Sequence, residues 1–148
     1  MRKKIVAANW KMNLTAGETG AYLETLLREV GDGNGVDIVV IPPFTSLSCA
    51  AEALTNTAQV KLGAQNMYWE KSGAFTGEIS AGMLRDLYVR YVVLGHSERR
   101  SLFGETDEIV NRKVKAAHEA GLKPIFCIGE TLEQRDAGEV EAVLERQL

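Results

Sequence analysis

Five short apolar runs, rich in β-branched residues, recur along this 148-residue chain and limit the folds it can adopt. They lie at residues 5–9, 38–42, 60–64, 91–95 and 125–129. Runs of this length without polar alternation are typical of strands that are buried on both faces. We therefore predict five strands of a buried, parallel sheet.

The segments between these runs carry helical signals. Thr15 and Glu18 match a capping box, and the apolar stripe that follows ends at Gly31, a residue typical of helix C-termini. Further helices are predicted at 47–54, 80–87, 105–121 and 131–148. Acidic residues in the first turn of the helix at 105–121, with Lys113 and Lys115 later, match the helix dipole. Regular alternation of strand and helix predicts right-handed crossovers between parallel strands.

Two parallel architectures compete for this pattern. A doubly wound sheet usually has a glycine-rich phosphate turn after its first strand. Here the first run ends in Asn9-Trp10-Lys11, and the chain contains neither GxGxxG nor a Walker motif. The sequence therefore favours a (β/α)8 barrel, in which the chemistry lies at the carboxyl ends of the strands. Polar residues follow three of the predicted strands: Asn9 and Lys11, Gln65 and Asn66, and His96, Ser97 and Glu98.

Composition narrows the class of ligand. The net charge is −3 with both signs spread along the chain, which argues against nucleic acid or a membrane surface as the main partner. No apolar run approaches the roughly 20 residues of a membrane span, and no signal peptide is evident. Cys49 and Cys127 lie too far apart to suggest a disulfide or zinc framework, so we expect no metal and a reducing, cytoplasmic location. A small molecule is the expected ligand.

Four segments resemble the triosephosphate isomerase family. They are ANWKMN at 8–13, GAFTGE at 73–78, LGHSERR at 94–100 and CIGET at 127–131. The resemblance covers the whole chain but only part of the family's length, because a complete barrel needs about 250 residues and eight strands. The predicted fold is therefore α/β, an incomplete (β/α)8 TIM barrel whose first five βα units form one partial domain over residues 1–148.

The resemblance implies roles for four residues. Asn9 and Lys11 would bind the substrate, a triose phosphate, and His96 would act as the catalytic electrophile. Glu98 would pair with Lys11 and assist turnover, and no cofactor is implied. In the family the histidine is neutral and polarises the carbonyl group while a glutamate moves the proton. A short helix starting at 97–100 would also lower the pKa of His96 through its dipole. Without the resemblance, Lys11 also reads as a solvated surface charge, Glu98 as a solvated acid at a helix start, and His96 as a satisfied core histidine.

The segment at 65–79 is too long for an ordinary strand-to-helix connection and is rich in glycine and aromatic residues. The resemblance implies that it inserts into the partner subunit of a homodimer. Thr76 would lie near the partner's active site, with Gln65, Glu78 and Arg99 at further interface positions. A mobile surface loop is the alternative, but exposure of Met67, Tyr68, Trp69 and Phe75 would be costly.

The family's base glutamate and lid follow the sixth strand, and its phosphate-binding amides follow the seventh and eighth. We therefore expect little or no isomerase activity from residues 1–148 alone. The first and fifth strands would be open edges, so self-association is expected, or completion by a chain that supplies the last three strands. Three interpretations stay open: an isomerase with a partial site, a non-catalytic oligomerising scaffold, and a half-enzyme that a complementary C-terminal fragment completes.

Overall fold

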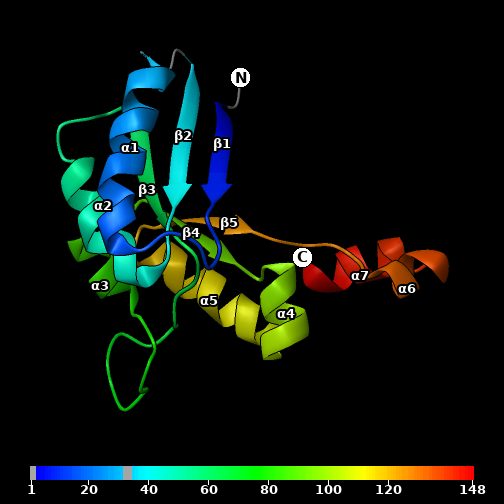
Figure 1. Ribbon diagram of the computed structural model, residues 1–148. Coiled ribbons are helices and arrows are strands. Elements are labelled where there is room, and N and C mark those ends of the chain that lie inside the picture. Colours follow the sequence, from blue (N-terminus) through cyan, green and yellow to red (C-terminus); the bar gives the residue numbers. More distant parts are fainter. Residues whose placement is uncertain (1–2, 32–34) are drawn as a thin grey trace.

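A computed structural model describes residues 3–31 and 35–148 and contains one curled, parallel sheet (Figure 1). Its strands are β1 (Lys4–Asn9), β2 (Val36–Ile41), β3 (Val60–Ala64), β4 (Tyr91–Leu94) and β5 (Lys123–Phe126). They pair in sequence order, β1-β2-β3-β4-β5, and every pair is parallel. The prediction of an incomplete α/β barrel of five strands is confirmed, and β1 and β5 are the edges of the described sheet.

Helices α1 to α5 lie between successive strands, and α6 and α7 follow β5 and extend away from the sheet (Figure 1). They are α1 (Ala16–Val30), the 3-10 turn η1 (Phe44–Ser46), α2 (Leu47–Ala53), α3 (Ala81–Asp86), α4 (Ser97–Phe103), α5 (Asp107–Glu119), α6 (Leu132–Asp136) and α7 (Val140–Gln147). The predicted capping box begins α1, where the Glu18 carboxylate accepts a hydrogen bond from the Thr15 amide at 2.8 Å. No helix within 3–31 and 35–148 is long and apolar enough to cross a bilayer.

Three boundary predictions were wrong. The fifth strand was predicted at 125–129 but ends at Phe126, and Gly129, with φ 147°, does not extend it. The single helix predicted at 131–148 is two helices, because Gly138 adopts φ 75° between them. Glu105 was placed in the first turn of a helix, but Thr106 caps that helix and leaves Glu105 before it.

The alternating side chains of the strands pack in two layers. Val40, Leu62 and Val92 face outward and pack with helix residues such as Leu23 and other members of the main core. The inward face carries a smaller cluster of Val39, Ile41, Tyr91 and Val93, against which Ile125 and Cys127 pack. Gly63 also belongs to this inner layer, because a Cβ atom there would lie 2.9 Å from the Ile41 side chain and 3.0 Å from that of Val39.

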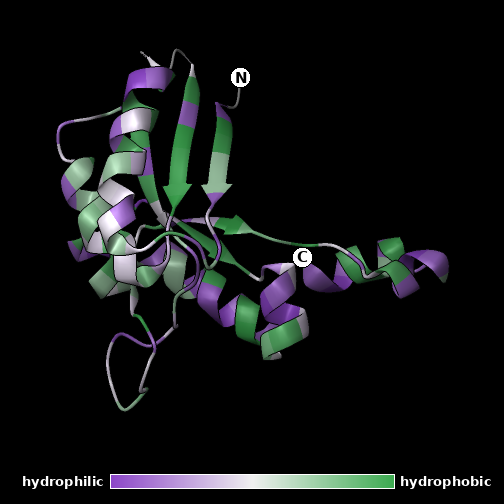
Figure 2. Cartoon of the chain, in the orientation of Figure 1, coloured by the Kyte–Doolittle hydropathy of each residue, from purple (hydrophilic) through white to green (hydrophobic). Residues whose placement is uncertain are grey.

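Strand β1 departs from the expectation of burial on both faces. Its successive residues Ile5 and Val6 point to opposite faces, yet they are 49% and 60% exposed. Figure 2 shows β1 as a largely hydrophobic strand. Within the described residues only β2 pairs with it, and no helix buries its other surface. The sequence of β1 is thus as apolar as that of a buried strand, although both of its faces are exposed in this sheet.

Candidate active site

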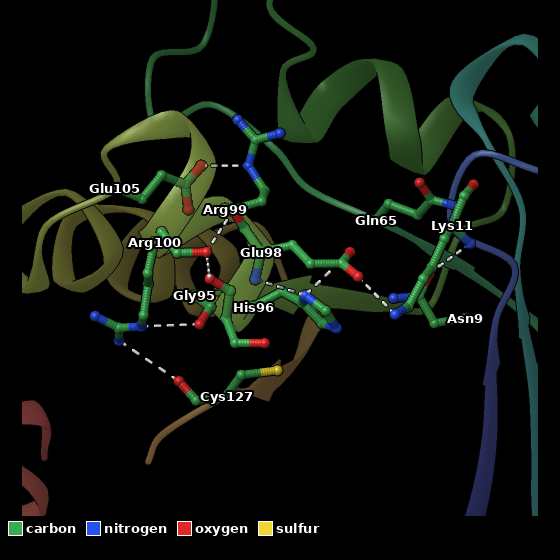
Figure 3. Close-up of polar contacts among 12 residues, drawn as sticks. Asn9, Lys11, Gln65, Gly95, His96, Glu98, Arg99, Arg100, Glu105 and Cys127 are labelled. Atoms are coloured by element: carbon green, nitrogen blue, oxygen red, sulfur yellow. Dashed lines mark hydrogen bonds and ion pairs between the residues drawn. The ribbon is translucent and has the colours of Figure 1, made fainter. Parts of the chain in front are cut away.

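Most of the polar residues predicted at the strand ends lie together at the carboxyl end of the sheet (Figure 3), whereas Asn66 belongs to a buried network that is described below. Asn9 ends β1, Lys11 follows it by two residues, and His96 and Glu98 follow β4. The Lys11 Nζ atom lies 2.6 Å from the Glu98 Oε1 atom, although 87 positions separate the two residues in sequence. The curvature of the sheet thus brings the end of its first strand to the end of its fourth.

Lys11 occupies a strained backbone conformation, with φ 53°. This left-handed region disfavours residues that have a Cβ atom, and such strain is typical of functional sites. Two side chains hold the conformation in place. The Asn9 Oδ1 atom accepts a hydrogen bond from the Lys11 amide at 3.0 Å, and the Gln65 Nε2 atom donates to the Lys11 carbonyl at 2.9 Å. Gln65 also donates to the Ile41 carbonyl at 3.1 Å, which ties the ends of β1 and β2 to β3.

The tautomer of His96 follows from its position at the start of α4. Its Nδ1 atom accepts a hydrogen bond from the Glu98 amide at 3.2 Å. A ring nitrogen that accepts carries no proton, so the imidazole is neutral and its proton is on Nε2. His96 thereby presents one N–H donor on the side of the ring away from its own helix.

Glu98 contacts Lys11 on one side and approaches His96 on the other. Besides the contact with Lys11, its Oε2 atom lies 3.6 Å from His96 Nδ1. The hydrogen bond from Lys11 lowers the pKa of the Glu98 carboxyl below its ordinary value, against the opposing effect of desolvation. Both partners of the Lys11–Glu98 pair are about half exposed, so the pair contributes more to orientation than to stability.

Arg100 supports this arrangement from behind, a role that we had not predicted. Its Nε atom donates to the Gly95 carbonyl at 2.8 Å, its Nη1 atom lies 2.5 Å from Asp107 Oδ1, and its Nη2 atom lies 3.5 Å from the Cys127 carbonyl. It therefore joins the end of β4, the first turn of α5 and the residue after β5. Cys127 is partly buried in the inner layer, and burial raises the pKa of its thiol. The only sequence signal for Arg100 was that it belongs to the LGHSERR segment at 94–100, which resembles the family.

A second charged network is buried beside α4. Lys113 donates to Glu105 Oε1 at 2.6 Å and to Asn66 Oδ1 at 2.9 Å, and Arg99 Nε lies 2.5 Å from the same Glu105 oxygen. Burial alone would raise the pKa of Glu105, but the hydrogen bonds from Lys113 and Arg99 outweigh it and lower the pKa. We had interpreted Glu105 and Lys113 as charges that follow the helix dipole. The overlooked signal is that Lys113 falls on the buried stripe of α5, between Val110 and Ala117.

The residues predicted for a dimer interface fall into two groups. Thr76 and Glu78 are exposed on the loop between β3 and α3, which extends well away from the sheet (Figure 1). Gln65 and Arg99, in contrast, bond within the chain as described above. The loop also packs on itself, since the Tyr68 ring stacks on Trp69 at 4.0 Å and lies 4.7 Å from Phe75.

Burial of Met67 does not require a partner subunit. Met67 is 1% exposed and lies in the chain's own core. Phe75 is 40% exposed, so it contributes apolar surface to the loop, whereas Met67 does not. Among residues 3–31 and 35–148, no group of three or more His, Cys, Asp or Glu side chains is arranged to hold a metal ion.

Comparison with known proteins identifies the family. The triosephosphate isomerase family model matches residues 4–148. The chain belongs to the triosephosphate isomerase family. It is 57% identical over 148 residues to the triosephosphate isomerase of Symbiobacterium thermophilum and 53% identical over 148 residues to that of Carboxydothermus hydrogenoformans. Each comparison covers 100% of this chain, but 57% and 59% of the respective relative. The triosephosphate isomerase of Aquifex aeolicus is 49% identical, with 99% of this chain and 59% of the relative covered. The chain thus spans less than two thirds of the length of these triosephosphate isomerases.

Proposed function

We propose that Asn9, Lys11, His96 and Glu98 form the substrate-holding part of a triosephosphate isomerase active site. The protein that contains them would interconvert dihydroxyacetone phosphate and glyceraldehyde 3-phosphate through an enediolate. One observation carries the proposal: a strained lysine just after β1 and a histidine after β4 both lie beside the carboxylate of Glu98. Packing alone does not require these polar residue types at the ends of β1 and β4.

Each side chain has a task in this proposal. The ammonium of Lys11 exchanges its contact with Glu98 for the anionic substrate and balances the developing charge. The free Nε2–H of His96 donates to the carbonyl oxygen, where negative charge collects in the enediolate. The Asn9 amide is oriented through its Oδ1 atom, which leaves its Nδ2 hydrogens to donate to a substrate oxygen.

The proton transfer itself needs a carboxylate within reach of both reacting carbons. Glu98 is held by Lys11, and its lowered pKa makes it a weak base. We therefore place the base outside residues 1–148, as the resemblance to the family implies. In this proposal residues 1–148 form one partial domain. A polypeptide limited to these residues would bind the substrate weakly and have little isomerase activity.

The loop between β3 and α3 would serve as a dimer contact. Thr76 and Glu78 are exposed on it and free to meet a second copy of the chain. In this arrangement Gln65 and Arg99 support the loop from its base, through their contacts to the Lys11 carbonyl and to Glu105. Cys49 and Cys127 are both free thiols, which fits a reducing cytoplasm as the location.

A half-enzyme that a second polypeptide completes is the alternative with an observation in its favour. The exposed residues Ile5 and Val6 of β1 offer an apolar surface that the remaining strands and helices of a barrel would bury. The interpretation as a non-catalytic scaffold has no comparable support, because it does not explain the strained backbone conformation of Lys11.

Binding of a phosphorylated carboxylate that mimics the enediolate tests the site. Calorimetric titration of the protein, in the full length its gene encodes, should show binding that Lys11→Met weakens at least about tenfold. Lys115→Met, which removes an exposed lysine on α5, is the matched control and should leave affinity unchanged. Binding that Lys11→Met leaves intact would contradict the proposal, and a non-catalytic scaffold would not bind the mimic.

A coupled isomerase assay tests the chemistry separately. His96→Gln should lower the kcat of the full-length protein by at least about a hundredfold, because the carbonyl loses its acid. The polypeptide of residues 1–148 should show almost no turnover. Turnover by that polypeptide near the full-length rate would place the base within the residues described above.

A further inference from the structure

Arg100 holds the backbone on both sides of the His96 ring (Figure 3). Its amide donates to the His96 carbonyl at 3.0 Å, as the first turn of α4 requires of any residue at this position. Its side chain adds a contact that helix geometry does not supply, because Nε donates to the Gly95 carbonyl at 2.8 Å. That carbonyl belongs to the planar peptide group that leads into His96, so the side chain fixes the orientation of this group.

Gly95 makes room for the guanidinium group. It has φ 70°, in the left-handed region that favours glycine. A Cβ atom at this position would lie 3.0 Å from Arg100 Nη2 and 3.2 Å from the Cys127 carbonyl oxygen. A residue with a side chain would therefore displace the guanidinium from the peptide group that it holds. The glycine and the arginine form one structural unit at the end of β4.

The rest of the guanidinium is fixed by two other segments of the chain. Nη1 lies 2.5 Å from Asp107 Oδ1 on α5, and Nη2 lies 3.5 Å from the Cys127 carbonyl oxygen after β5. Burial would raise the pKa of Asp107, but hydrogen bonds from Arg100 and Arg146 outweigh it and lower the pKa, so the carboxylate is charged at neutral pH. Only 17% of the Arg100 side chain is exposed. A planar guanidinium held at three points has little freedom to move.

The ring of His96 depends on the peptide group that Arg100 holds. As the N-cap of α4, His96 has φ −54° and ψ 140°, and in this conformation its Nδ1 atom accepts the Glu98 amide at 3.2 Å. Rotation of the preceding peptide group would change φ of His96 and move the ring away from that amide. A displacement of about 1 Å in a reacting group can cost about a hundredfold in rate.

We propose that Arg100 is a positioning residue for His96, an inference that rests on the isomerase function proposed above and deepens it. Arg100 holds the peptide group between Gly95 and His96 so that Nε2–H of the ring is aimed at the substrate carbonyl oxygen. Asp107 balances the charge of Arg100, so the arginine acts through geometry. Loss of its side chain should therefore slow turnover more than it weakens substrate binding.

Steady-state kinetics of the protein in its full length test this role. Arg100→Met removes the guanidinium and should lower kcat at least about tenfold, while KM changes less than about twofold. Arg100→Lys keeps one charged donor of the three and should lose less. Arg28→Met is the matched control, because it removes an exposed arginine of α1 and should leave both constants unchanged.

Nitrogen-15 NMR of the histidine rings gives a readout that a mere loss of stability does not change. In the unsubstituted protein His96 should be a single tautomer with its proton on Nε2, and comparison with His96→Gln identifies its signals. Folded Arg100→Met should show a mixture of tautomers, whereas Arg28→Met should keep the single one. If Arg100→Met does not fold, Arg100→Lys provides both measurements.

Three results would overturn the inference and leave the proposed function intact. They are an unchanged kcat in both Arg100 variants while His96→Gln loses activity, a rise in KM as large as the fall in kcat, and an unaltered His96 tautomer in an Arg100 variant whose kcat is lowered. Full activity of His96→Gln would instead contradict the function proposed above.

Discussion

Lys11 shows how one residue combines strain and electrostatics. Its left-handed backbone is held by Asn9 and Gln65, and its ammonium by Glu98. These contacts come from three different strand ends, so the lysine is positioned by the sheet as a whole. A strained residue that its surroundings fix this firmly is preorganised to meet a charge.

Replacement of Lys11 by glycine and by alanine separates these two contributions. Both variants lose the contact with Glu98, but only glycine relieves the left-handed strain. Lys11→Gly should therefore be more stable than Lys11→Ala by about 1 kcal/mol in urea unfolding. Equal stabilities would show that the conformation at residue 11 carries no strain.

Glu105 gives stability a defined pH dependence. Its folded-state pKa is lowered from the ordinary 4.5, so its contribution is fully present above that pH and is lost as the pH falls through the lower, folded-state value. Glu105→Gln should cost about 3 kcal/mol at pH 7, since it leaves the Lys113 charge buried without a counter-ion. It should also flatten the loss of stability below pH 4.5.

Urea unfolding at a series of pH values measures both effects. Glu119→Gln is the matched control, because it makes the same substitution at an exposed position of α5. If the stability of Glu105→Gln falls with decreasing pH in parallel with that of the wild type, Glu105 is not the source of this pH dependence.

The sequence predicted the strand-end residues but missed the network behind them. Asn9, Lys11, His96 and Glu98 stand in short motifs directly after apolar runs, so local pattern suffices to find them. The partners Glu105, Lys113 and Arg100 depend on how α4 and α5 pack, and a charge on a buried helical stripe is easily taken for a surface charge. Long-range ion pairs leave no periodic signal.

At the scale of elements, the inner layer of the sheet depends on the absence of a side chain at Gly63. Gly63→Ala should destabilise the chain by about 2 kcal/mol, because the added carbon meets Ile41 and Val39, whose side chains are almost fully buried. Thermal or urea unfolding measures the loss.

Gly20→Ala should have the opposite effect and increase stability. Gly20 lies within α1, and no neighbouring atom stands within 4 Å of the place that a Cβ atom would take, so alanine should stabilise the helix by about 0.5–1 kcal/mol. A similar loss in both variants would show that the crowding at Gly63 is not the cause.

Element types were easier to predict than element ends. The helix at 16–30 has a capping box, a long stripe and a terminal glycine, and its bounds were predicted closely. The region after Thr131 has a second capping box but also Gly138, whose backbone conformation separates α6 from α7. The apolar run at 125–129 did not reveal where β5 begins, because pairing with β4 extends back to Lys123.

At the scale of the whole molecule, the exposed strand β1 should drive association of a polypeptide limited to residues 1–148. Ile5 and Val6 expose apolar surface on both faces of an edge strand. Analytical ultracentrifugation at micromolar concentration should find dimers or larger species, and Val6→Lys should shift them toward monomer. A compact monomer of the unsubstituted polypeptide would contradict this prediction.

The sequential strand order has a consequence for biosynthesis. Every strand pairs with the one made just before it: Lys4 with Val36, for example, and Tyr91 with Lys123. A ribosome adds about 5–20 residues per second, so successive strands emerge seconds apart. Each newly exposed strand finds its neighbour already translated, and the sheet can grow one βα unit at a time without waiting for a distant partner.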